Sequence, residues 1–126
     1  MAAAERVVIV LWSAGPDRLH LVAAPFVYAL AARALEHEVE IHYTADCVHW
    51  LFEGVAGSAF TDSARTKTVA DFMREAKAAG IRQYACSMAL AEHRRRGEPL
   101  VELLDGQAGA ASVVGALGDG ARVLVF

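Results

Sequence analysis

The sequence has few of the features that would place a protein in a membrane, on nucleic acid or in an oxidising compartment. It has only two cysteines in 126 residues, too few for a disulfide-stapled scaffold, which favours a reduced, cytoplasmic setting. Its formal net charge of −3 gives no electrostatic reason to bind nucleic acid or an anionic membrane. The longest apolar stretch near the amino terminus, residues 7–12, is too short for a membrane span or a signal-peptide core. We therefore expect a soluble, intracellular protein.

The composition is rich in apolar and small side chains. Hydrophobic residues make up 56% of the chain, and many of them are alanine. This favours closely packed helices, and it also favours a partner subunit that covers apolar surface. A chain of this length can bury one core but not two, so residues 1–126 are expected to form a single domain.

Strand-like and helix-like segments alternate along the whole chain. The β-branched run RVVIVLW at 6–12 is typical of a strand that is covered on both faces. Further strands are predicted at 39–44, 81–86 and 121–126, with a short fifth strand at 58–61. Strands separated by helices indicate βαβ units, so the predicted fold is α/β. We expect a three-layer α/β/α sandwich around a parallel sheet of four to five strands.

Helical patterns fill the intervals between these strands. Apolar residues recur on one face from 19 to 35, where Pro25 predicts either a kink or a later helix start. The clearest stripe is at i, i+3, i+4 and i+7 in the segment 69–76. Other helices are expected after Asp46, at 88–95 and at 107–117, and a loop rich in glycine, serine and threonine is expected at 54–67.

The predicted sheet has one edge at which a ligand would bind. In open parallel sheets ligands bind beyond the carboxyl ends of the strands. Three strand-to-helix loops should meet there, at 12–15, 44–47 and 86–87. They bring both cysteines to this edge, together with the candidate supporting residues Ser13, Gly15, Asp46, His49 and Ser87.

Cys86 is the candidate catalytic residue. It lies between a predicted strand and a predicted helix, where unpaired N–H groups and a partial positive charge stabilise a thiolate. Such a position can lower a thiol pKa well below about 8.5 and make the sulfur nucleophilic at neutral pH. The alternative is that Cys86 is simply a small, buried apolar side chain.

Cys47 lies in a D-C-x-H arrangement with Asp46 and His49. In a functional interpretation His49 acts as a base and Asp46 orients it. In a structural interpretation Asp46 caps a helix, His49 is a surface residue and Cys47 packs beneath the helix. A third hypothesis is a reversible disulfide between Cys47 and Cys86, which requires Cα atoms within about 7 Å.

No cofactor and no metal are predicted. The loop at 13–16 matches neither a dinucleotide fingerprint nor a P-loop. His42, Cys47 and His49 are close in sequence, but they lack the spacing of a zinc site. The run HRRR at 93–96 is either a solvated helix end or a patch that docks an anion or a partner protein.

Three segments together resemble the DsrE/DsrF-like family, which includes sulfur-relay subunits. They are VVIVLWSAGP at 7–16, CSMALAEHRRRG at 86–97 and the closing ARVLVF at 121–126. The resemblance implies a sulfur carrier in which Cys86 holds sulfane sulfur as a persulfide and passes it from a donor protein to an acceptor protein. It also implies a homo-oligomer (a trimer or hexamer) or a hetero-oligomer with sister subunits. Because the fold alone does not decide function, a non-catalytic module that binds a small anion at helix N-termini is the alternative.

Overall fold

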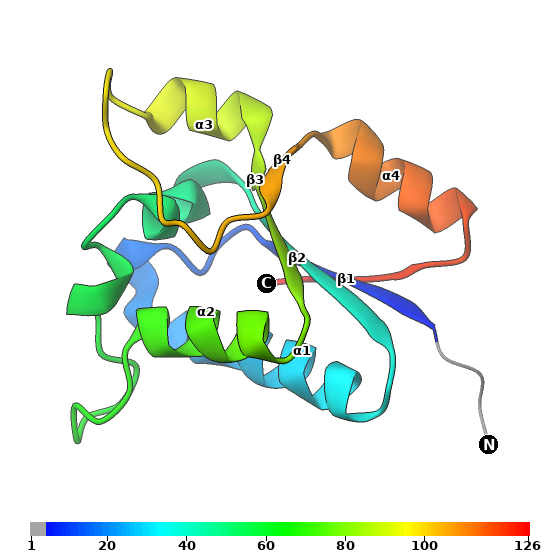
Figure 1. Cartoon of the computed structure of the whole chain (residues 1–126), viewed down its shortest axis with the longest axis horizontal. Coiled ribbons are helices and arrows are strands. Elements are labelled where there is room, and N and C mark those ends of the chain that lie inside the picture. The colour runs from blue at the N-terminus through cyan, green and yellow to red at the C-terminus, as the bar shows by residue number, and fades with distance from the viewer. Residues whose placement is uncertain (1–4) are drawn as a thin grey trace.

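The computed structural model describes residues 5–126, which form a wholly parallel five-stranded sheet with helices on both sides (Figure 1). The strands are β1 (Arg6–Leu11), β2 (Glu38–Tyr43), β3 (Arg82–Cys86), β4 (Gly106–Ala108) and β5 (Arg122–Val125). They are arranged in the order β4-β3-β2-β1-β5, and every neighbouring pair is parallel.

The direction of each connection decides which face a helix covers. The helices α1 (Ala23–Ala34), α2 (Val69–Ala78) and α3 (Ser87–His93) join strands that advance in one direction across the sheet. The helix α4 (Ala110–Gly118) instead leads from β4 back to β5 at the opposite edge. Right-handed crossovers therefore place α4 on the face opposite α1 and α2, as Figure 1 shows. The predicted three-layer α/β/α sandwich is confirmed.

The two faces of the sheet are covered unequally. The face toward α1 and α2 carries the main core, which includes Ile9, Ile41 and Phe26. The opposite face has only a small buried cluster, because its single helix α4 has nine residues and only Ala116 of them is buried. As a result, α4 and the edge strand β5 expose large apolar side chains to solvent, namely Val114, Leu117, Leu124 and Val125.

Local sequence signals explain where two of the helices begin. Pro25 lies in the first turn of α1, where a missing backbone N–H costs no hydrogen bond. A separate 3₁₀ helix, η1 (Pro16–Leu21), precedes α1, so the predicted later helix start is confirmed. The helix α2 begins at a capping box, in which Thr68 and Asp71 exchange side-chain and backbone hydrogen bonds. The four apolar residues of its predicted stripe are all buried.

The predicted position of the fifth strand is wrong. Phe60 makes only an isolated antiparallel bridge with Thr68, and the fifth strand is instead β4. Residues 107 and 108 were expected to begin a helix, but Ala108 pairs with Cys86 in the sheet and α4 starts only after Gly109. Glycine is a poor helix former, and pairing with β3 supplies backbone partners that local sequence signals do not reveal.

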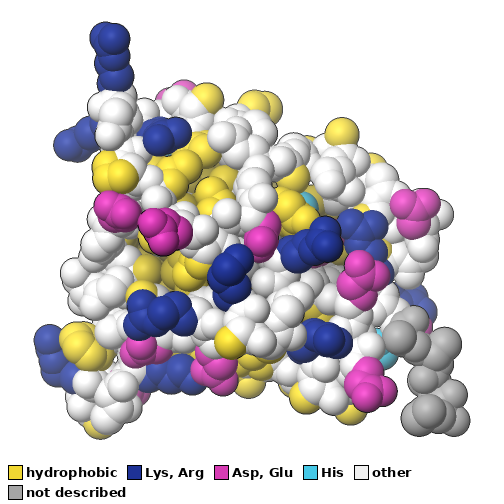
Figure 2. All heavy atoms as spheres, in the orientation of Figure 1, with side chains coloured by type: hydrophobic (Ala, Val, Ile, Leu, Met, Phe, Trp, Pro, Cys, Tyr) yellow, Lys and Arg dark blue, Asp and Glu magenta, His cyan; other side chains and the backbone are white. Residues whose placement is uncertain are grey.

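Charged side chains of both signs lie on the face of the molecule shown in Figure 2. On this face, Lys and Arg side chains alternate with Asp and Glu side chains around apolar patches. Such a mixed surface creates no extended field of one sign. Among the described residues, no helix has both the length and the apolar character needed to cross a bilayer.

Candidate functional site at Cys86

Cys86 ends β3 and occupies the N-cap position of α3. The parallel register of β2 and β3 pairs Tyr43 with Ala85. The residues that follow these two, Thr44 and Cys86, therefore meet at the carboxyl edge of the sheet. The Thr44 hydroxyl and the backbone N–H groups of Met88 and Ala89 are the polar groups that act on the sulfur. Cys86 therefore lies at the carboxyl edge of the sheet, as the sequence predicted.

The surroundings of Cys86 change the acidity of its thiol. Partial burial of Cys86 by itself raises the pKa. The backbone N–H of Ala89, the Thr44 hydroxyl and the backbone N–H of Met88 together outweigh burial, so the pKa lies below that of a free thiol. Hydrogen bonds to the charged form favour it, and a thiolate is the nucleophilic form of cysteine.

Cys86 opens into an apolar cavity of about 240 Å³ between α4 and its face of the sheet. Five valines of β1, β5 and α4 line it, together with Trp12. The polar side chains that line it come from His42, Thr44 and Cys86. No lining residue comes from the loop 54–67, which contacts α2 through η3 (Ala56–Ser58).

His42 gives this cavity a buried polar group without a partner. The residue is 4% exposed, and its Nε2 has no hydrogen-bond partner among the described residues. The nearest carboxylate oxygen, Glu40 Oε1, is 3.5 Å away, at the outer limit of a hydrogen bond. Burial lowers the pKa of His42 more than Glu40 raises it, which favours the neutral imidazole. A neutral ring offers either a donor or an acceptor at Nε2, according to its tautomer.

Cys47 lies in a different environment from Cys86. It is fully buried in the main core, and burial is the largest cause that raises its pKa, to about 12. Both cysteines are free thiols in the structure. A buried thiol that stays protonated is a poor participant in thiol–disulfide exchange, so the structure favours the structural interpretation of Cys47.

Asp46 and His49 each contact His93, a residue outside the predicted D-C-x-H arrangement. His49 Nε2 lies 3.2 Å from His93 Nδ1, and Asp46 Oδ1 lies 3.6 Å from His93 Nε2. In the part of the chain that the structure describes, no hydrogen bond joins His49 to Cys47. Asp46 does not cap the 3₁₀ helix η2 (Ala45–Leu51), because Thr44 occupies the N-cap position and no side-chain cap bond forms.

The remaining predicted residues have other surroundings. Gly15 is the N-cap of η1, and a Cβ there would meet Asp46 Cβ at 3.4 Å, a close packing contact. Ser13 is exposed, and its backbone N–H donates to the Phe126 carbonyl at 2.9 Å. Neither Gly15 nor Ser13 lines the Cys86 cavity. Ser87 follows Cys86 directly but opens into a separate groove.

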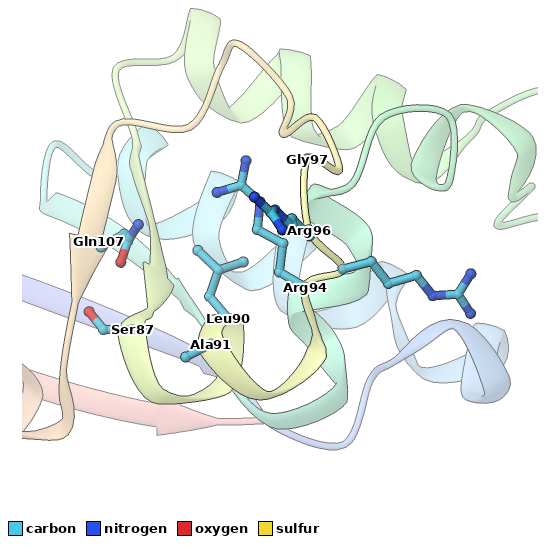
Figure 3. Close-up of a pocket in the computed structure, with 8 residues that line it drawn as sticks. Ser87, Leu90, Ala91, Arg94, Arg96, Gly97 and Gln107 are labelled. Carbon is cyan, nitrogen blue, oxygen red and sulfur yellow. The ribbon is translucent and has the colours of Figure 1, made fainter.

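That groove, of about 470 Å³, runs along α3 and is bordered by arginines. Figure 3 shows Ser87 and Gln107 at one end, Leu90 and Ala91 of α3 on its floor, and the arginine segment 94–96 at the other end. Arg94 Nε donates to the Glu98 carbonyl, which holds this turn together. Arg94, Arg95 and Arg96 of the run HRRR therefore all border this one groove, and all three are exposed.

Sequence reasoning missed the roles of His42, Thr44 and His93. The alternation of β2 does place His42 and Thr44 on one face, but only the pairing of β2 with β3 puts them beside Cys86. The sequence analysis considered His93 only as part of the run HRRR at 93–96. Its contact with His49 spans 44 positions of the chain and leaves no local signal.

The fold and the site define a class of protein, a parallel α/β domain with a cysteine between a strand and the helix that follows it. The family model of the DsrE/DsrF-like family matches residues 6–126, so the chain belongs to the DsrE/DsrF-like family. No curated protein matches the chain.

Two solved structures share the fold. The ychN protein from E. coli is 14% identical with a TM-score of 0.71, over 98% of this chain and 100% of that one. MTH1491 from Methanobacterium thermoautotrophicum, a protein of unknown function, is 20% identical with a TM-score of 0.67, over 97% of this chain and 99% of that one. At these identities the likeness shows the fold alone.

Proposed function

We propose that the protein is a sulfur carrier that holds sulfane sulfur as a persulfide on Cys86 and passes it to a partner protein. The observation that carries this proposal is the position of the thiol, which ends β3 at the N-cap of α3 and opens into an apolar cavity. A lowered pKa supplies the nucleophile, and the cavity supplies space for one additional sulfur atom. Membership of the DsrE/DsrF-like family supports the same conclusion.

The proposed transfer consists of two balanced exchange steps. The Cys86 thiolate attacks the terminal sulfur of a donor persulfide, forming a new S–S bond while the donor S–S bond breaks and the donor leaves as a thiolate. An acceptor thiolate then attacks the terminal sulfur on Cys86 and releases the Cys86 thiolate. Neither step needs a net oxidant or reductant, because sulfane sulfur keeps its oxidation level throughout.

The cavity would protect the persulfide between the two steps. Its valines offer no polar group to water or small thiols, and a partner subunit that covers the exposed Val114 and Val125 would close it, so that small thiols could not remove the terminal sulfur. The imidazole of His42 also lines the cavity and would lie near the bound sulfur. The loop 54–67 contributes no residue to this cavity.

The exposed apolar surface of α4 and β5 supports the proposal of an oligomer. Leu117 is 52% exposed and Val125 58% exposed, on a helix and an edge strand that lie next to the Cys86 cavity. Apolar patches and unpaired strand edges of this kind are commonly covered by another subunit. We include self-association through this surface in the proposal, with donor and acceptor proteins reaching Cys86 from the carboxyl edge of the sheet.

Intact-protein mass spectrometry after incubation with a sulfane-sulfur donor tests the carrier function. The expected result is a gain of one or more sulfur atoms that reductant removes, present in the wild type and in Cys47→Ala but absent in Cys86→Ser. Circular dichroism of both variants would establish that they are folded. Normal loading of folded Cys86→Ser, or no loading of the wild type, would overturn the proposal.

One observation favours the alternative of a small-anion binding module. The groove along α3 is bordered by Arg94, Arg95 and Arg96 and does not include the Cys86 thiol. If the wild type takes up no sulfur but binds sulfate or phosphate, and Arg95→Gln with Arg96→Gln removes that binding, this function replaces the carrier function.

A further inference from the structure

We propose that Asp46, His49 and His93 form a binding site for a divalent transition-metal ion of the Zn²⁺ class. Asp46 and His49 lie on η2, and His93 is the last residue of α3. One ligand atom from each of the three side chains lies within 4.8 Å of the other two. This proposal is independent of the sulfur-carrier function, because no cysteine takes part in it.

The spacing of the two imidazoles is that of metal ligands. His49 Nε2 and His93 Nδ1 are 3.2 Å apart, with the rings inclined at 69°. Two nitrogens that each bind a tetrahedral Zn²⁺ at about 2.0–2.1 Å are separated by about 3.4 Å. A metal ion can therefore replace the proton that the two rings would otherwise share, after only a small adjustment of the side chains.

Asp46 completes the cluster from the other side of His93. Its Oδ1 lies 3.6 Å from His93 Nε2, while its side chain is 67% exposed and can turn toward the ion. A carboxylate beside a ligating histidine strengthens metal binding, either as a third ligand or by holding the ring in orientation. The exposure of Asp46 also leaves a path by which the ion and a water ligand can enter.

The protein scaffold holds the two histidines in place. The helices η2 and α3 pack against each other, and buried Val48, Trp50 and Leu90 anchor them on the core. The His49 ring also packs edge-on against Phe52, with centroids 5.2 Å apart. Ligands on anchored elements lose little side-chain entropy when an ion binds, which favours specific over non-specific metal binding.

The ligand types indicate which ions would bind. Two imidazole nitrogens and one carboxylate oxygen suit Zn²⁺, Co²⁺ or Ni²⁺, whereas Mg²⁺ and Ca²⁺ prefer a shell made wholly of oxygen. His93 lies seven residues beyond Cys86, about 10 Å along the helix axis, so the metal cluster and the thiol are separate sites.

Isothermal titration of metal-free protein with Zn²⁺ tests the proposal. We expect one Zn²⁺ per wild-type chain, and an affinity reduced at least about tenfold in His49→Gln, in His93→Gln and in Asp46→Asn. His20→Gln is the matched control, because His20 is exposed and outside the cluster, and it should bind as the wild type does. Circular dichroism of the metal-free variants would establish that each of them is folded.

Two further readouts separate this site from the Cys86 site. Cys86→Ser should bind Zn²⁺ with unchanged affinity, and Co²⁺ bound to the wild type should show no sulfur-to-cobalt charge-transfer band. A wild type that binds no Zn²⁺, or a folded His49→Gln or His93→Gln that binds as tightly as the wild type, would overturn the proposal. Loss of binding in Cys86→Ser would also overturn it, because the thiol would then be the ligand.

Discussion

Thr44 and Cys86 lie side by side at the carboxyl ends of two neighbouring strands, β2 and β3. These residues are 42 positions apart, and only the parallel register of the strands brings them together. The Thr44 hydroxyl lowers the pKa of Cys86, so an ordinary β-sheet pairing contributes directly to the acidity of the thiol.

Thr44→Val should raise the pKa of Cys86, because hydrogen bonding by the Thr44 hydroxyl is one of the causes that lower it. The pH dependence of the iodoacetamide reaction rate reports this pKa, and the profile should shift to higher pH. Thr44→Ser keeps a hydroxyl and should retain the wild-type profile. Identical profiles for the wild type and Thr44→Val would show that the bond has no influence on the thiol.

The two cysteines should differ strongly in their reaction with iodoacetamide under native conditions. Cys86 is partly exposed and has a lowered pKa, whereas Cys47 is fully buried with its pKa raised to about 12. Peptide mapping should therefore find the label on Cys86 in folded protein, and on both residues only after denaturation. Equal labelling of Cys47 in the native protein would contradict the buried position found for it.

His42 should make the folded state less stable in mildly acidic solution. Burial lowers its folded-state pKa below 6.5, so the unfolded chain binds a proton first as the pH falls. Above the unfolded-state pKa, His42 is neutral in both states and costs the folded state nothing. As the pH decreases below that value, the free energy of unfolding falls progressively, because the unfolded chain gains a proton that the folded protein does not.

Urea unfolding of the wild type and of His42→Leu measures this effect. Between about pH 7.5 and about pH 5, the free energy of unfolding should fall less in His42→Leu than in the wild type. The exposed His20→Gln serves as a control that should follow the wild type. An equal fall in all three proteins would mean that His42 does not contribute.

Tyr43→Phe should destabilise the main core. The Tyr43 hydroxyl donates to Gln83 Oε1 at 2.5 Å, and Gln83 Nε2 in turn donates to the Met73 carbonyl at 3.0 Å. Removing the hydroxyl leaves a fully buried amide oxygen without a donor, at a cost of about 1–3 kcal/mol. Urea unfolding measures the loss, and Tyr28→Phe, on the 56% exposed Tyr28, should cost much less.

Leu117→Glu should weaken self-association. Leu117 is 52% exposed on α4 and does not line the Cys86 cavity, so a charge there disturbs the surface without altering the thiol site. Light scattering coupled to size-exclusion chromatography should show an oligomeric wild type and a smaller species for the variant. Ser112→Glu, also on α4, is the control for added charge alone. A monomeric wild type would contradict the proposed assembly.

Much of the fold could be predicted because its signals are local. The β-branched run of β1 and the four-residue apolar stripe of α2 each identify an element from its own residues. The alternation of strands and helices then predicts a parallel sheet. By contrast β4 has three residues and no pattern of its own, since its strand conformation comes from pairing with β3.

The sequence by itself determined the class of fold, the position of Cys86 between a strand and a helix, and membership of the family, because each depends on neighbouring residues or on the order of elements. Only the tertiary structure decided what surrounds the thiol. The register of β2 and β3 brought Thr44 and His42 to it, and the packing of η2 against α3 joined His49 to His93. Such contacts between distant segments arise from backbone pairing and core packing, and neither leaves a periodic signal in the sequence.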